Sequence, residues 1–215
     1  MTDVLPSHAA QLSPRRTQTR HRLMDAAVSA FAERGIIGAS VEEICESAGF
    51  TRGAFYSNFT DKDELVVALL RTEIDNQYQA AEHAITAMKT AADSDTSAEK
   101  LVSIALTAFE EAGRAGRGWI LTQQELLLYA ARVPKVREAY LAYSDECLKQ
   151  FSSLIGDAIV YAGREFTVSF EDAVMLLGAA HQQVHLTALL NGEPPDSRPM
   201  GVLLLAITRP TSGPA

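Results

Sequence analysis

The feature that most constrains this chain is a pair of short helices joined by a tight turn. Ser40 and Glu43 have the S-x-x-E spacing of a capping box, in which each side chain accepts a hydrogen bond from a backbone N–H where a helix begins. The helix that this box predicts runs from Val41 to Ala48 and ends at Gly49, because glycine favours the left-handed backbone that closes helices. A second short helix is predicted to begin at Thr51.

The second helix has one apolar face and one face of small polar groups. Phe55 and Phe59 are spaced i, i+4 and are expected to face a core. At about 100° per residue, Gly53 and Ser57 point away from these rings. Glycine inside a helix costs about 1 kcal/mol relative to alanine. We therefore interpret Gly53 as a place where another molecule approaches the backbone closely.

Residues 49–65, G-F-T-R-G-A-F-Y-S-N-F-T-D-K-D-E-L, resemble the signature of the TetR family of bacterial transcription regulators. With the preceding helix, predicted at 19–34, the resemblance covers roughly residues 15 to 65. It implies an all-α fold, with a three-helix helix-turn-helix DNA-binding domain followed by a helical-bundle regulatory and dimerisation domain. Without the resemblance, a structural αα-hairpin with a polar surface would explain the same residues.

Composition and charge agree with this division of the chain. A content of 47% hydrophobic and 21% charged residues is typical of a globular protein. Residues 1–62 contain seven basic and seven acidic residues, and the other 153 contain twelve and twenty, so the net charge of −8 belongs to the later part. We predict a disordered tail at 1–14, a DNA-binding domain at 15–62 and a helical ligand-binding and dimerisation domain at 63–215.

The periodicity of apolar residues predicts further helices beyond the signature. A polar break is expected at 89–97, and a glycine-rich loop at 113–118. The predicted helices span residues 61–88, 98–112, 119–132, 134–162, 170–191 and 200–207.

The DNA-binding residues are inferred from their places on the two short helices. The helix from Thr51 to Phe59 is expected to lie in a major groove of a palindromic operator, with Arg52 as the base reader. The basic group Arg15–Arg22 is interpreted as an arm on DNA phosphates, the alternative being a solvated helix start. The DNA-binding candidates are Arg20, Ser40, Thr51, Arg52, Gly53, Tyr56, Ser57 and Lys62.

Aromatic and polar residues of the later helices are candidates for an effector pocket, with plain core packing as the alternative. The pocket candidates are Phe109, Trp119, Gln123, Tyr129, His181 and His185. The two histidines have the i, i+4 spacing that can bind a metal, but no glutamate completes an H-E-x-x-H motif. We therefore expect hydrogen-bonded histidines, no metal and no cofactor. A metal-dependent enzyme built on this pair is the remaining enzymatic alternative, since no nucleophile motif is present.

The last two long helices are apolar over more than one stripe, so each is expected to meet several neighbours. In the family such helices pair with their copies, which predicts a homodimer. The interface candidates are Cys147, Phe151, Leu154, Leu177, Val184 and Ala188. The expected function is a cytoplasmic repressor, without membrane contact, that an unknown small molecule releases from its operator. The alternative is a DNA-binding regulator that has no small effector and works through a protein partner.

Overall fold

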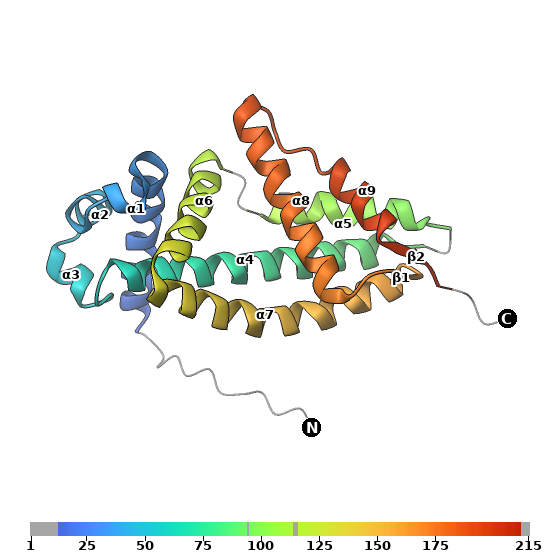
Figure 1. The fold of residues 1–215 in the computed structure, drawn as a ribbon, viewed down its shortest axis with the longest axis horizontal. Coiled ribbons are helices and arrows are strands. Elements are labelled where there is room, and N and C mark those ends of the chain that lie inside the picture. Colours follow the sequence, from blue (N-terminus) through green and yellow to red (C-terminus); the bar gives the residue numbers. More distant parts are fainter. Residues whose placement is uncertain (1–12, 94, 114–115, 212–215) are drawn as a thin grey trace, which may run out of the picture.

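The computed structural model describes residues 13–93, 95–113 and 116–211, except for the side chains of residues 146 and 147. The predicted disordered tail lies, up to residue 12, outside this range. The described chain is almost entirely helical, as predicted. Three helices form a group at one end, and long helices run from there to the end that carries two short strands (Figure 1).

The amino-terminal group consists of α1 (Pro14–Gly38), α2 (Val41–Ala48) and α3 (Arg52–Tyr56). The capping box is confirmed in both directions, because the Ser40 hydroxyl accepts from the Glu43 N–H and the Glu43 carboxylate accepts from the Ser40 N–H. Gly49 ends α2 in the left-handed region at φ 70°, and the Thr51 hydroxyl caps α3. These contacts confirm the predicted helix-turn-helix.

The later helices follow the apolar periodicity closely. The α4 helix connects the two ends of the molecule in Figure 1, and α8 ends at a left-handed Gly192. The helices are α4 (Lys62–Ala91), α5 (Ala98–Ala112), α6 (Arg117–Arg132), α7 (Pro134–Tyr161), α8 (Phe170–Asn191) and α9 (Arg198–Ala206).

Two three-residue strands were not predicted. They are β1 (Arg164–Phe166) and β2 (Thr208–Pro210), which pair antiparallel. Arg164, the first residue of β1, is buried. Its Nε donates to the Thr208 hydroxyl at 2.8 Å, and its guanidinium also donates to the Thr208 carbonyl. The strands thus join the end of α7 to the end of α9.

One core unites the amino-terminal helices and continues into the rest of the chain. Phe31, Phe55 and Phe59 are fully buried in it, as their spacing predicted. Trp119 and Leu126 of α6 belong to the same core. The DNA-binding domain is therefore packed directly against α6. Helices on both sides of the boundary predicted at residue 62 contribute to this one core.

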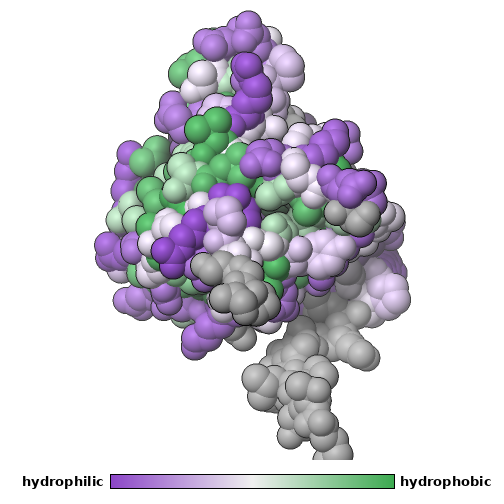
Figure 2. Space-filling view, turned by 90° about the vertical axis from the view of Figure 1, so that its right-hand side faces the viewer, coloured by the Kyte–Doolittle hydropathy of each residue, from purple (hydrophilic) through white to green (hydrophobic). Residues whose placement is uncertain are grey.

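The α8 helix, every residue of which is described, leaves most of its apolar side chains partly or fully exposed. Only Ala173, His185 and Ala188 are buried in it, whereas Met175 and Leu190 are 64% and 76% exposed. By length and composition alone, α8 is also apolar enough to cross a membrane. Figure 2 shows that hydrophobic residues also reach the surface at the end of the molecule that carries the strands.

Candidate nucleic-acid interface and effector cavity

The exposed face of α3 is the surface that the sequence predicted for DNA. Phe55 is fully buried and its ring lies 5.6 Å from that of Phe59, so the aromatic pair fixes which side of α3 faces outward. The exposed residues of this segment are the predicted DNA-binding candidates Thr51, Arg52, Gly53, Tyr56 and Ser57.

Gly53 is not required by the fold of the subunit. Its φ is not in the left-handed region, and among the described residues a Cβ at this position would meet only the Thr51 hydroxyl, at 3.7 Å. This separation is ordinary van der Waals contact. The space that a side chain would occupy is therefore left open toward solvent, where a second molecule can approach the backbone.

Arg52 is held on the surface by an ion pair. Its guanidinium lies 2.8 Å from the Glu42 carboxylate and 5.9 Å from the centre of the Tyr56 ring. A hydrogen bond to Tyr56 and the charge of Glu42 raise the pKa of Arg52. Both partners of the ion pair are more than half exposed, and such pairs contribute little to stability. The arginine can therefore leave Glu42 for a base edge at small cost.

The hydroxyl groups of three DNA-binding candidates also serve the local fold. Ser40 and Thr51 accept the capping N–H groups of α2 and α3, and the Ser57 hydroxyl donates to the Ala54 carbonyl at 2.9 Å. A hydroxyl has one donor and two acceptor sites. Thr51 keeps its proton for a phosphate oxygen, whereas Ser40 donates to Glu43 and Ser57 to Ala54, so these two would first have to release those partners. Their contacts with phosphate stay predictions.

The basic group at the start of α1 binds the ends of the short helices. Arg16 donates to the Ser57 carbonyl at 3.0 Å, and Arg20 donates to that of Asn58 and stacks 4.0 Å from the centre of the Phe59 ring. Arg22 donates to the Ala48 carbonyl at 2.7 Å, at the end of α2. In the subunit these cations stabilise the carboxyl ends of α2 and α3, where the helix dipole favours positive charge. Their contact with DNA phosphates stays a prediction.

Arg20 is the DNA-binding candidate that these contacts affect most. Only 20% of its side chain is exposed, and burial lowers the pKa of its guanidinium although Glu64 lies 3.8 Å away. The structure therefore presents Arg20 as a residue that positions α3.

Lys62 has a second role that explains its place in a first helical turn. Its Nζ donates to the carbonyls of Ile36 and Ala39 at 2.6 and 2.9 Å, and burial lowers its pKa. The ammonium group has three donors, so one remains for a phosphate. The phosphate contact stays a prediction. The structure adds that Lys62 links the start of α4 to the end of α1 through these two hydrogen bonds.

The α6 helix connects the DNA-binding domain to the later helices. The Thr122 hydroxyl, fully buried, donates to the Val28 carbonyl at 2.8 Å, and Glu125 accepts from the Ile36 N–H at 3.2 Å. A Cβ added at Gly35 would stand only 2.9 Å from the Glu125 carboxylate. Gly35 also has a φ of 71°, in the left-handed region. A side chain at Gly35 would therefore meet both backbone strain and this carboxylate.

A large apolar cavity lies among the later helices. Its volume is about 330 Å³, and residues of α4, α5, α7, α8 and α9 line it. Apolar side chains dominate the wall, as is usual for small-molecule sites. Members of the wall include Met88, Leu106, Phe109, Tyr140, Leu148, Phe151, Ile155, Leu177, His181 and Leu204.

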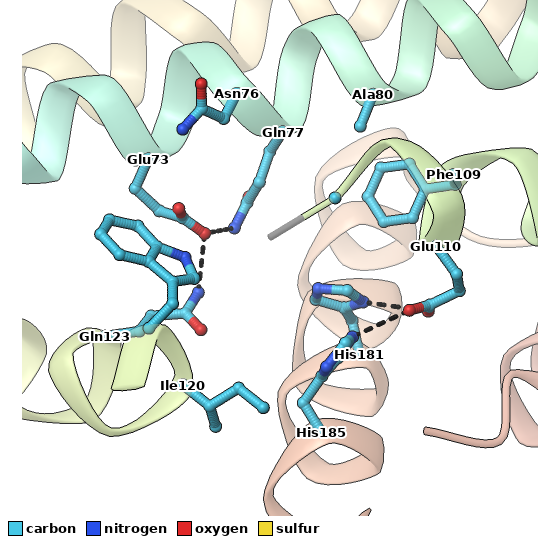
Figure 3. Close-up of a pocket in the computed structure, with 12 residues that line it drawn as sticks. Glu73, Asn76, Gln77, Ala80, Phe109, Glu110, Ile120, Gln123, His181 and His185 are labelled. Carbon is cyan, nitrogen blue, oxygen red and sulfur yellow. Dashed lines mark hydrogen bonds and ion pairs between the residues drawn. The ribbon is translucent and has the colours of Figure 1, made fainter. Parts of the chain in front are cut away.

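A smaller and more polar pocket adjoins the cavity. Its volume is about 30 Å³, and Phe109 and His181 line both spaces. Within it, Glu73 accepts hydrogen bonds from Gln77 and from the predicted pocket residue Gln123 (Figure 3). Of the other pocket candidates, Trp119 and His185 also line this pocket.

Tyr129 does not belong to either space as the described residues define them. Its hydroxyl donates to the Asp63 carboxylate at 2.7 Å, which ties α6 to the start of α4. Burial and the nearby carboxylate raise the pKa of Tyr129 to about 12. The structure thus gives Tyr129 a helix-joining contact, and its pocket role stays a prediction.

The histidine pair meets a carboxylate that the sequence did not identify. Glu110 of α5 lies 3.0 Å from His185 and 3.7 Å from His181, and Figure 3 shows both rings on α8 turned toward it. The spacing of residues around the histidines could not predict this contact, because Glu110 lies on a helix far away in the sequence. Only the apolar faces of the two helices indicated that they could meet.

The predicted interface residues divide between the interior and the surface. Phe151 and Leu177 line the cavity, and Ala188 is buried in the subunit. Leu154 and Val184 are half-buried, and the side chain of Cys147 lies outside the described residues. The strongly exposed apolar side chains are others, among them Val160, Met175, Leu190 and Val202.

Residues 23–69 match the family model described as bacterial regulatory proteins, tetR family. The amino-terminal domain belongs to the TetR family. This domain is 47% identical over 53 residues to the transcriptional regulator TtgR of Pseudomonas putida, a match that covers 25% of each chain. It is 37% identical over 67 residues to the repressor KstR2 of Mycobacterium tuberculosis, covering 31% of this chain and 32% of that one.

The alignments with these curated TetR relatives thus span about a quarter to a third of their length. Solved structures match over most of the chain. The regulator FadR from Bacillus halodurans aligns with a TM-score of 0.66 at 19% identity, covering 87% of this chain and 94% of that one. GusR from Salmonella enterica aligns with a TM-score of 0.64 at 20% identity, covering 92% and 97%. At such identities the likeness shows the fold alone, which these regulators share with this chain throughout the aligned range.

Proposed function

We propose that this chain is a dimeric repressor that places α3 in the major groove of a two-fold symmetric operator. The observation that carries the proposal is the outward face of α3, where Arg52 stands beside a glycine that the subunit itself does not need. Arginine is the commonest reader of guanine, through two hydrogen bonds to one base. The exposed Thr51 hydroxyl accepts the Ala54 N–H and is suited to donate its own proton to a phosphate. The Ser57 hydroxyl can do so once its proton leaves the Ala54 carbonyl.

Selection of duplexes from a random pool tests this proposal. The expected product is a palindrome whose half-sites are about one helical turn, roughly 34–36 Å, apart or a little more. Arg52→Ala should then relax the preference at one base pair per half-site by about 5- to 150-fold. An equal loss on all sequences would contradict the role of base reader.

The second copy is expected on the exposed apolar side of α8. Met175, Ala179 and Leu190 are exposed at helical spacing on this helix, and Val160 at the end of α7 is 67% exposed. Exposed apolar stripes of this kind mark protein interfaces. Met175→Glu should yield monomers in analytical ultracentrifugation and abolish tight operator binding, whereas His83→Gln, a change of an exposed residue on α4, should do neither.

The cavity supports control by an apolar small molecule. Its volume of about 330 Å³ falls within the range of ligand sites, and its wall is apolar. Another solved structure, that of the transcriptional regulator FadR from Bacillus subtilis, was determined in complex with stearoyl-CoA and aligns with a TM-score of 0.61 at 17% identity. We propose an effector with a hydrocarbon body, and the cavity favours this reading over the alternative that uses a protein partner alone.

The α6 helix offers a path from the cavity region to DNA. Gln123 reaches the polar pocket next to the cavity, while Thr122 and Glu125 on the same helix contact α1. An effector acts only through different affinities for two arrangements of the subunits. A movement of α6 would shift α1, and α1 carries the arginines that hold α3. We place this activity in the cytoplasm, where the operator is.

A further inference from the structure

Glu110 and the two histidines form a compact cluster between two helices. His181 and His185 stand one turn apart on α8, and Glu110 faces them from α5 (Figure 3). One ligand atom from each residue lies within 4.8 Å of the others. The cluster lies in the wall of the small polar pocket, and His181 also lines the apolar cavity.

The polar atoms of this cluster are buried and poorly satisfied. The His185 side chain is 8% exposed and that of Glu110 is 15% exposed. Glu110 Oε1, His181 Nδ1 and both ring nitrogens of His185 are buried without a well-formed hydrogen bond. Buried polar groups are nearly always satisfied, so the unsatisfied Glu110 Oε1 and His181 Nδ1 atoms, which face each other at 3.7 Å, indicate a ligand between them.

The spacing of these atoms fits a divalent metal ion. Three ligands of a tetrahedral zinc ion, each ~2.0–2.1 Å from the metal, stand ~3.3–3.4 Å from one another. Glu110 Oε2 lies 3.0 Å from His185 Nε2, and Glu110 Oε1 lies 3.7 Å from His181 Nδ1, so the two carboxylate oxygens each face one ring nitrogen at a separation near this value. Two imidazoles and one carboxylate are a common set of protein ligands for zinc, with the fourth position open.

We propose that Glu110, His181 and His185 bind one Zn²⁺ ion that joins α5 to α8. The ion takes the place between the three side chains and satisfies the orphaned atoms that face it. Both helices contribute to the wall of the apolar cavity, so the ion also fastens one side of that wall. Its fourth position is available to water or to an anionic group of a molecule in the adjoining pocket.

The test uses the full chain, stripped of metal with a chelator and titrated with Zn²⁺ against a chromogenic competitor. We expect one tightly bound ion per chain and a rise in the melting temperature, because a ligand of the folded state stabilises it. Glu110→Gln and His185→Gln should each weaken binding by more than about 100-fold. His83→Gln, a change of an exposed histidine on α4, should leave the affinity unchanged.

Circular dichroism shows whether each variant remains folded, and His181→Gln replaces any variant that does not. Co²⁺ bound in place of Zn²⁺ should give the intense visible absorption of a four- or five-coordinate site, which the Glu110→Gln variant should lose. Wild-type protein without a stoichiometric ion, or variants that bind as wild type does, would overturn the proposal, as would a site that takes other divalent metals and not zinc. The titration involves no DNA, so its failure would leave the proposed repressor function standing.

Discussion

A Gly53→Ala substitution adds one methyl group to the exposed face of α3. Within the subunit this methyl would meet only the Thr51 hydroxyl among the described atoms, at 3.7 Å, so no neighbour has to move. Alanine is favoured over glycine inside helices by about 1 kcal/mol. The variant should therefore melt up to about 2–4 °C higher than the wild type, the shift expected for 1 kcal/mol in a chain of this size.

The same methyl should weaken binding to the operator. If DNA approaches the backbone at Gly53, the added group meets a close-packed contact, and overpacking of this kind costs about 1–3 kcal/mol. Binding measured by fluorescence anisotropy should weaken about 5- to 150-fold. Gly118→Ala is the matched control, since its Cβ would meet Ala32 in ordinary contact at 3.8 Å, far from α3 in the chain. A Gly53→Ala protein that binds the operator as tightly as wild type would refute the reasoning.

Four further substitutions test separate contacts. Glu42→Gln removes the exposed partner of Arg52, so operator affinity should rise, by less than about fivefold. Arg20→Ala frees the carboxyl end of α3, so the free energy of unfolding should fall by about 1–3 kcal/mol and all DNA sequences should bind more weakly. The pKa of Tyr129 is raised to about 12, so its hydrogen bond to Asp63 stabilises the fold fully below pH 10, and this stabilisation is lost as the pH rises from about 10 to about 12. The free energy of unfolding of Tyr129→Phe, measured by chemical denaturation, should not show this fall between pH 10 and 12. Ala105→Trp narrows the cavity, so the operator affinity should persist while release by an apolar effector fails.

The helix-turn-helix could be predicted from the sequence because its determinants are local. The Ser40–Glu43 box, the left-handed Gly49 and the Phe55–Phe59 pair each act within a few residues, and each is found as expected. Periodicity likewise located the later helices to within a few residues at most ends.

Contacts between distant segments could not be predicted in this way. The arginines of α1 were interpreted as a DNA arm because their partners, the carbonyls that end α2 and α3, come 26 to 41 residues later. Glu110 was missed for the same reason. The apolar stripes of α7 and α8 were assigned to an interface, whereas Phe151 and Leu177 turn toward the cavity, since periodicity shows that a face is buried but not what buries it.

The most direct measurement of the central claim is a protection experiment on a selected operator. Hydroxyl-radical footprints of the wild-type protein should show two equivalent protected half-sites, related by two-fold symmetry, and methylation of one guanine in each major groove should block binding. The Arg52→Ala protein should no longer be sensitive to that methylation. A single asymmetric footprint, or binding that ignores major-groove methylation, would contradict the account.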